Sequence, residues 1–130
     1  MPTVENVAAK EEPMTTPAPR FLPLETISVR LEGLNGQSER RKVFGLVSNM
    51  SETGACVITN LSVPQDTDVR LTIAGVRTDA TIVAARVIWC AERLEPVKEV
   101  VGYLTGLTFD DDEASTIRTL LSSGIFQLVP

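Results

Sequence analysis

The chain has 130 residues, a length that usually corresponds to a single domain. It carries 12 Lys and Arg against 17 Asp and Glu, for a formal net charge of −5, and it contains no His. The acidic balance argues against a grip on long nucleic acid, which requires many cations facing phosphates. The lack of His removes the commonest proton-transfer group and metal ligand. We therefore expect a binding or signalling module that is not an enzyme, with no DNA or RNA partner and no metal.

Localisation signals are equally sparse. The first residues, Met-Pro-Thr-Val-Glu-Asn, lack the basic start and apolar core of a secretory signal, and no apolar run approaches the ~18 residues that span a bilayer. Cys56 and Cys90 lie in apolar, strand-like contexts, and a secreted scaffold of this size normally carries more cysteines. We expect a cytoplasmic protein without membrane insertion, whose two thiols are reduced and buried.

Residues 1–23 differ in composition from the rest of the chain. They hold five of the eight prolines and one aromatic residue, Phe21. Such a segment cannot bury enough apolar surface to offset the entropy lost on ordering. We therefore expect a flexible Pro-rich tail over 1–23 and a folded domain over 24–130.

Short strands are predicted along most of the domain. Apolar and polar residues alternate with a period of two from Thr26 to Glu32, as in a strand with one wet face. Turn residues at 35–36, 49–54 and 64–66 separate this strand from those that follow. The further strands expected are about 42–48, 55–59, 69–75, 78–90 and 101–109. Because the segment 78–90 is long for one strand, we expect a bulge near Ala84 and Ala85.

The pattern changes to helical spacing after the sixth strand. The apolar positions at this spacing are Ala114, Ile117, Leu120 and Leu121. Asp110 with Glu113 fits a capping box, and Gly124 is a suitable C-terminal stop. Six short strands followed by one helix predict a mainly β fold, a six-stranded antiparallel barrel with a C-terminal α-helix packed on it.

Several motifs resemble those of the PilZ domain family. Asn49, Ser51 and Gly54 match its Asp/Asn-x-Ser-x-x-Gly motif between two strands. Val-Ile-Trp at 87–89 resembles the apolar run that closes the family's long strand, and Gly-Leu-Thr-Phe at 106–109 resembles its Gly-x-x-Phe strand. The likeness covers residues 20–123. It implies a PilZ-like barrel and, in many members, binding of the bacterial second messenger cyclic di-GMP.

The resemblance also implies which residues contact the ligand. In the family, an Arg-x-x-x-Arg pair before the first strand holds phosphates and packs on guanine, while the Asn and Ser of the second motif bond to the nucleotide. The Gly allows a sharp turn with nothing projecting into the ligand. Arg20 matches the second arginine, but Thr16 stands in place of the first, and the basic cluster of Arg40, Arg41 and Lys42 follows the first strand. The candidate ligand-binding residues are Arg20, Arg40, Arg41, Asn49, Ser51 and Gly54.

Structural alternatives remain open for these residues. Asn49, Ser51 and Gly54 also suit a polar turn between strands, and Trp89 suits packing in the barrel core or rim. Two functions are consistent with the sequence. One is a PilZ-type signalling or adapter module that binds cyclic di-GMP, weakly if an arginine contact is missing, and relays it to a protein partner. The other is a degenerate PilZ-fold interaction module for motility, pilus or flagellar control that binds no nucleotide. No cofactor is expected apart from this ligand.

Overall fold

The computed structural model describes residues 19–33, 43–76, 79–93 and 102–129. Thr16 and the basic cluster at 40–42 lie outside the described residues. The strands are β2 (Phe21–Pro23), β3 (Ser28–Gly33), β4 (Val43–Met50), β5 (Gly54–Thr59), β6 (Asp68–Ala74), β7 (Thr81–Glu92), β8 (Tyr103–Phe109) and β9 (Phe126–Leu128). A 3-10 turn, η1 (Asp111–Glu113), leads into the helix α2 (Ala114–Leu121).

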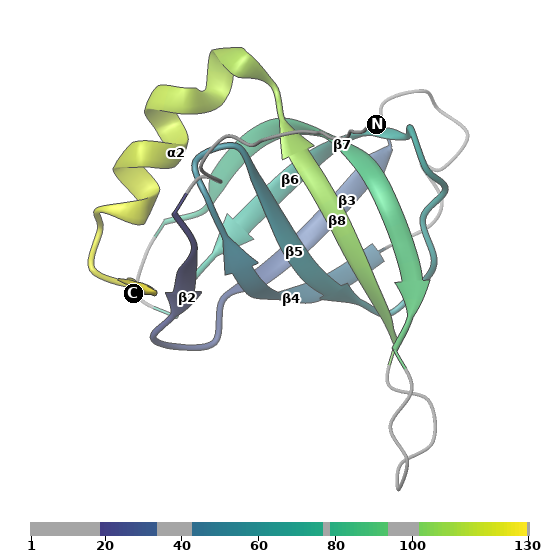
Figure 1. The fold of residues 1–130 in the computed structure, drawn as a ribbon, viewed down its shortest axis with the longest axis horizontal. Helices are drawn as coiled ribbons and strands as arrows, with labels where there is room; N and C mark the ends of the chain where they lie inside the picture. The colour runs from purple at the N-terminus through teal and green to yellow at the C-terminus, as the bar shows by residue number, and fades with distance from the viewer. Residues whose placement is uncertain (1–18, 34–42, 77–78, 94–101, 130) are drawn as a thin grey trace, which may run out of the picture.

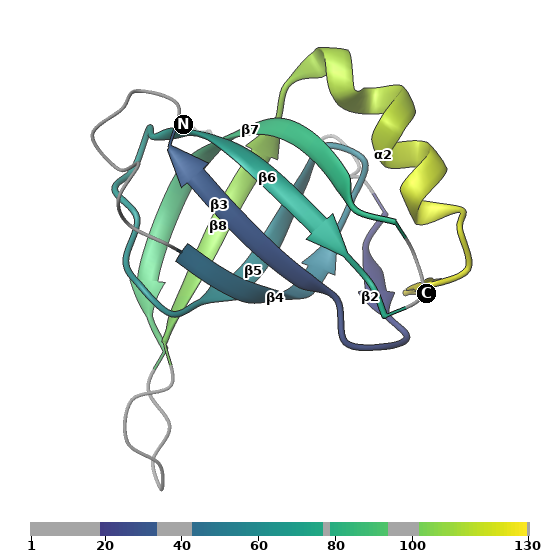
Figure 2. The ribbon, with the colours of Figure 1, turned by 180° about the vertical axis from the view of Figure 1, so that it is seen from behind.

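Six of the strands close into a barrel. Their order is β3-β6-β7-β8-β5-β4, and a further pairing between β3 and β4 closes the ring. All six pairings are antiparallel. Both views of the ribbon show the barrel with α2 lying beside one end of it (Figures 1 and 2). The predicted mainly β barrel with a C-terminal helix is confirmed.

The barrel interior is an apolar core that follows from the alternation in the sequence. Val29 and Leu31 of β3 and Leu71 and Ile73 of β6 are buried, while the residues between them face outward or are only partly covered. Side chains that alternate across a pleated strand place every second residue on the same face. The helix adds Ile117, Leu120 and Leu121 to the same core cluster.

Two strands contain bulges. In β7 the register shifts between Val87 and Trp89, and in β4 it shifts between Val47 and Asn49. The predicted bulge near Ala84 is wrong, because the segment 81–86 pairs with β6 in unbroken register. A bulge inserts one extra residue into a strand, so the side chains after it face the opposite way from what a regular strand would give.

Regular structure begins earlier in the chain than the expected boundary at residue 24. Phe21–Pro23 form β2, which pairs with β9 along its whole length and with β4 through Phe21 and Met50. Phe21 also packs against the core, and Phe126 of β9 is buried. Ordered structure therefore begins before residue 24, and β9 is an element that the sequence pattern does not predict.

The connection from β8 to the helix is held by the backbone of β7. The predicted capping box is wrong, because neither Asp110 nor Glu113 makes a side-chain capping bond. Instead, Glu113 Oε2 accepts a hydrogen bond from the Ala84 amide at 2.7 Å, and the Asp110 amide donates to the Ala84 carbonyl at 3.1 Å. The glutamate thus ties the start of the helix to the barrel wall.

The helix ends before the residue expected to stop it. Its last residue is Leu121, and Gly124 has a φ of 99° in the turn that leads into β9. This left-handed conformation is one that glycine adopts without strain. Across the described ranges, no helix is long and apolar enough to cross a membrane.

Candidate functional site

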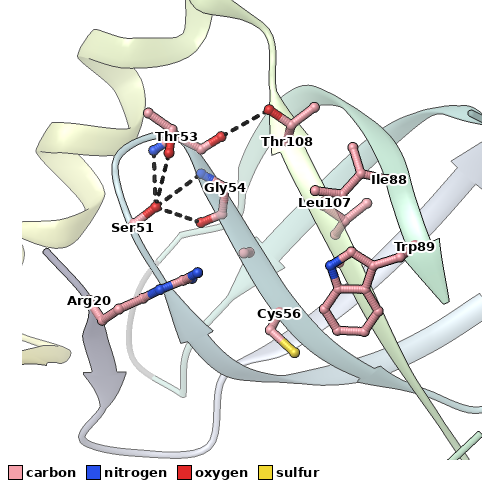
Figure 3. Close-up of a pocket in the computed structure, with 11 residues that line it drawn as sticks. Arg20, Ser51, Thr53, Gly54, Cys56, Ile88, Trp89, Leu107 and Thr108 are labelled. Carbon is pink, nitrogen blue, oxygen red and sulfur yellow. Dashed lines mark hydrogen bonds between the residues drawn. The ribbon is translucent and has the colours of Figure 1, made fainter. Parts of the chain in front are cut away.

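The outer wall of the barrel is hollowed beside β2. The cavity measures about 150 Å³, and its lining includes Arg20, Ser51, Gly54, Cys56, Trp89 and Thr108 (Figure 3). Pockets that enclose a drug-sized ligand usually measure about 300–1,000 Å³. A cyclic dinucleotide placed here would therefore lie partly outside the hollow, against the surrounding wall.

The strand register explains which residues face this hollow. Asn49 of β4 lies opposite Cys56 of β5, Cys56 lies opposite Gly106 of β8, and Gly106 lies opposite Trp89 of β7. The four residues form one row across the outer wall. In regular strands, Asn49 would point inward like Val47, and Trp89 would point inward like Val87. The two bulges turn both side chains outward, on either side of β5 and β8.

Trp89 is the aromatic side chain of this row. Its side chain is 43% exposed, so the structure places it on the outer wall instead of in the barrel core. A Cβ at Gly106 would collide with the indole ring, because the ring lies directly against the Gly106 backbone. Glycine at position 106 therefore gives the ring room to lie flat on β8 at the rim of the hollow.

Arg20 reaches the same row from β2. Its Nη1 donates a hydrogen bond to Asn49 Oδ1 at 2.9 Å, and its backbone carbonyl accepts one from the Val129 amide at 2.9 Å. In Figure 3 the guanidinium extends from β2 towards β5. The guanidinium retains N–H groups for an anion, and the amide nitrogen of Asn49 remains available as a donor.

Ser51 is a turn residue in this structure. Its side chain is only 3% exposed, and its Oγ accepts hydrogen bonds from the amides of Thr53 and Gly54, both at 3.2 Å. The Ser51 amide donates to the Gly54 carbonyl at 2.8 Å and completes the turn. The hydroxyl therefore organises the turn that forms one side of the hollow.

Gly54 is required for a reason other than the expected sharp turn. Its φ is not in the left-handed region, but a Cβ at this position would collide with the Leu107 carbonyl oxygen of β8. The absence of a side chain lets β5 and β8 approach closely where the hollow begins.

Cys56 lies at the floor of the hollow and is uncharged at neutral pH. Burial raises the pKa of its thiol, and the nearby positive charge of Arg20 opposes this only in part. Neither cysteine forms a disulfide in the structure, and Cys56 and Cys90 are only partly buried, so the prediction that both are buried is wrong. Cys90 lies 3.4 Å from Thr105 Oγ1, away from the hollow lining.

The charges around the hollow are unequal. Among the described residues that line the hollow, the positive charge is carried by Arg20. Beyond Thr108, Arg86 pairs with Asp68 at 2.9 Å, and a neighbouring depression combines Arg86 with the carboxylates of 110–112. An anionic group is therefore favoured on the Arg20 side of the hollow and disfavoured on the far side.

The structure brings four of the predicted residues together. Arg20, Asn49, Ser51 and Gly54 all lie at or beside the hollow, whereas Arg40 and Arg41 lie outside the described residues. Cys56 and Thr108 also line it, although no sequence motif singled them out as ligand contacts. Within the described part of the chain, no group of three or more His, Cys, Asp or Glu residues is placed to hold a metal ion.

The fold and the hollow define a small β-barrel module with a shallow recess on its outer wall. A family model for the PilZ domain matches residues 18–127, and the chain belongs to this family. No curated protein matches the sequence.

Two solved structures share the fold. The PilZ domain of CeSA from a cellulose-synthesizing bacterium is similar at 17% identity and a TM-score of 0.53, over 77% of this chain and 92% of that one. The PilZ domain of YcgR from Escherichia coli, solved with c-di-GMP, is similar at 8% identity and a TM-score of 0.59, over 79% of this chain and 86% of that one. At these identities the likeness establishes the fold.

Proposed function

We propose that this PilZ domain binds cyclic di-GMP at the hollow and relays its presence to a protein partner. The observation that carries the proposal is the Arg20 to Asn49 hydrogen bond of 2.9 Å, which holds a guanidinium in the same outer-wall row as Trp89. A cation, an amide and an exposed aromatic ring in one row are able to bind the phosphate, the base edge and the base face of a guanine nucleotide.

Each of these groups has a distinct part in the proposed binding. The planar guanidinium of Arg20 forms forked hydrogen bonds to phosphate oxygens, which an ammonium group cannot do. The amide of Asn49 bonds to polar atoms of the nucleotide, and the indole face of Trp89 stacks on a base. Base–aromatic stacking contributes about 1–3 kcal/mol per base.

Binding would begin from a partly assembled site. Arg20 already contacts Asn49 without a ligand, because β2 is paired with β9. The ligand therefore has to share or replace one hydrogen bond, and the segment from Arg20 onward does not have to be ordered first. A partner that distinguishes the occupied from the empty hollow would complete the relay, since a ligand shifts a population only through such a difference.

A titration with cyclic di-GMP tests the proposal. Trp89 is the only Trp of the chain, so its fluorescence reports on the hollow, and calorimetry gives the affinity in parallel. Arg20→Ala removes a charged hydrogen bond and is expected to weaken binding roughly ten- to hundredfold. The matched control is Arg30→Ala on β3, which lies outside the hollow lining and is expected to bind like the wild type. The proposal would be refuted if the titration gave no heat and no fluorescence change at ~0.5 mM ligand.

One observation favours the alternative of an interaction module without nucleotide. The Ser51 hydroxyl is already engaged by the turn, so this member of the family motif is not freely available to a ligand. Replacing Thr16 by Arg separates the two functions. If a single arginine contact is missing, Thr16→Arg creates or strengthens binding of cyclic di-GMP. If the variant and the wild type both fail to bind, the interaction module is the better description.

A further inference from the structure

The position of Arg20 depends on the C-terminal strand. Apart from its contact with Asn49, Arg20 is placed by β2, which meets the barrel through Phe21 opposite Met50. The pairing of β2 with β9 is more extensive and runs over the whole of β2. It is extended at both ends, by the Val129 amide donating to the Arg20 carbonyl and the Leu24 amide donating to the Ile125 carbonyl, each at 2.9 Å.

The strand β9 is itself anchored on the core. Ile125 and Phe126 are buried, and they follow directly after α2 and its turn. In contrast, Leu128 is 54% exposed and Val129 is partly exposed, so their side chains contribute little burial. The contribution of Val129 is its backbone N–H, which donates to the carbonyl of Arg20 just before β2.

We propose that β9 positions Arg20 for nucleotide binding, with Val129 as a positioning residue that acts through its amide. The inference rests on the proposed function, and it adds a role for a part of the chain that does not line the hollow. If the Val129 bond is lost, the Arg20 backbone is free to leave the row, and only a fraction of molecules holds the guanidinium beside Asn49. The apparent affinity falls in proportion to that fraction.

The coupling works in both directions. A ligand that grips Arg20 favours the paired state of β2 and β9, because the effect of one site on another is reciprocal in free energy. Amide hydrogen exchange at Val129 is therefore expected to slow when cyclic di-GMP is bound. Exchange at an amide of β3 or β6 that is far from the hollow serves as the internal reference.

The decisive variant is Val129→Pro, which removes this one N–H just beyond the end of β9. We expect a loss of about three- to tenfold in affinity for cyclic di-GMP, the effect of one ordinary hydrogen bond. The matched control is Val76→Pro, which removes an N–H that donates to Glu25 Oε2 at 2.7 Å and lies outside the hollow lining. Equal losses in the two variants would overturn the inference, because they would reflect general destabilisation.

A double-mutant cycle separates positioning from an unrelated structural effect. If Val129 acts through Arg20, the Val129→Pro effect on affinity disappears in an Arg20→Ala background. An effect of the same size in both backgrounds would show that Val129 does not act through the arginine, and it would overturn the inference.

A second readout needs no ligand, so it distinguishes failure of the inference from failure of the proposed function. Trypsin cleaves after Arg20 only when this segment opens, and the rate follows the open population. Val129→Pro is expected to accelerate cleavage at this bond about three- to tenfold, and Val76→Pro to leave it unchanged. If Val129→Pro is cleaved faster but the wild type binds no cyclic di-GMP, the positioning of Arg20 by β9 is retained and cyclic di-GMP is rejected as the ligand. An unchanged rate would reject the positioning itself.

Discussion

Replacing Ser51 by Ala tests whether this residue holds the β4–β5 turn. The substitution removes the oxygen that accepts from the Thr53 and Gly54 amides. A buried group left without its partner costs about 1–3 kcal/mol. Thr53 is exposed, so water reaches part of the turn, and we expect the lower part of that range, about 1–2 kcal/mol.

The expected loss is large enough to measure by unfolding without any ligand. For a domain of this size, 1–2 kcal/mol corresponds to a decrease in Tm of about 3–10 °C. Circular dichroism during heating and urea denaturation give two independent values. The matched control is Ser115→Ala on the exposed face of α2, which is expected to change stability by less than about 0.5 kcal/mol. A Tm for Ser51→Ala equal to that of the control would refute the structural role of the hydroxyl.

Two further predictions concern the floor and rim of the hollow. Gly106→Ala places a methyl group against the indole of Trp89, so we expect a red-shifted tryptophan emission and a loss of about 1–3 kcal/mol in stability; unchanged emission and melting would contradict the packing of the ring on β8. Because burial raises the pKa of the Cys56 thiol, alkylation of this residue by iodoacetamide in the folded protein should need a higher pH than alkylation of an ordinary thiol. The protonated thiol favours the folded state, and this contribution to the free energy of unfolding should be lost as the pH rises through the raised pKa. Peptide mass spectrometry during alkylation measures this, and a midpoint at or below the ordinary value of about 8.5 would contradict it.

The barrel strands are predictable because each has one buried face. Between Thr26 and Glu32, and again between Val69 and Ile73, apolar residues recur at every second position, and the structure places strands there. The alternation within each strand and the helical spacing after the sixth are local in the sequence, so a pattern of a few residues is sufficient to indicate them. The strand order is not local, because β3 pairs with β6 and β5 pairs with β8 although neither pair is consecutive in the chain.

The outward direction of Asn49 and Trp89 is not predictable by the same rule. Counting in twos from the buried Val47 or Val87 places each side chain inside the barrel. The bulges that reverse them are set by hydrogen bonding to the neighbouring strands, and no residue type in β4 or β7 marks where the extra residue falls. The family motif indicates Asn49 as a ligand contact, whereas the sequence leaves Trp89 compatible with packing in the barrel core or at its rim.

The pairing of β2 with β9 and the role of Glu113 depend on contacts between distant parts of the chain. Phe21 and Leu128 face each other although they lie near opposite ends of the sequence, and strands of three residues are too short to show a period. At the helix start, the spacing of Asp110 and Glu113 fits a cap, but the glutamate instead accepts from the Ala84 amide. At the helix start a tertiary partner replaces the local cap that the sequence suggested, and at β2 a distant strand supplies a partner where the sequence suggested none.

The bond between the Val129 amide and the Arg20 carbonyl also joins two parts of the barrel module that are far apart in the sequence. Domains whose early and late segments lie side by side tolerate being joined to other domains with little disturbance of their core. In this barrel, Arg20 and Val129 meet beside the hollow. A reporter domain fused behind β9 would be attached close to Val129, whose amide donates to the Arg20 carbonyl, so such a fusion is well placed to detect a ligand in the hollow.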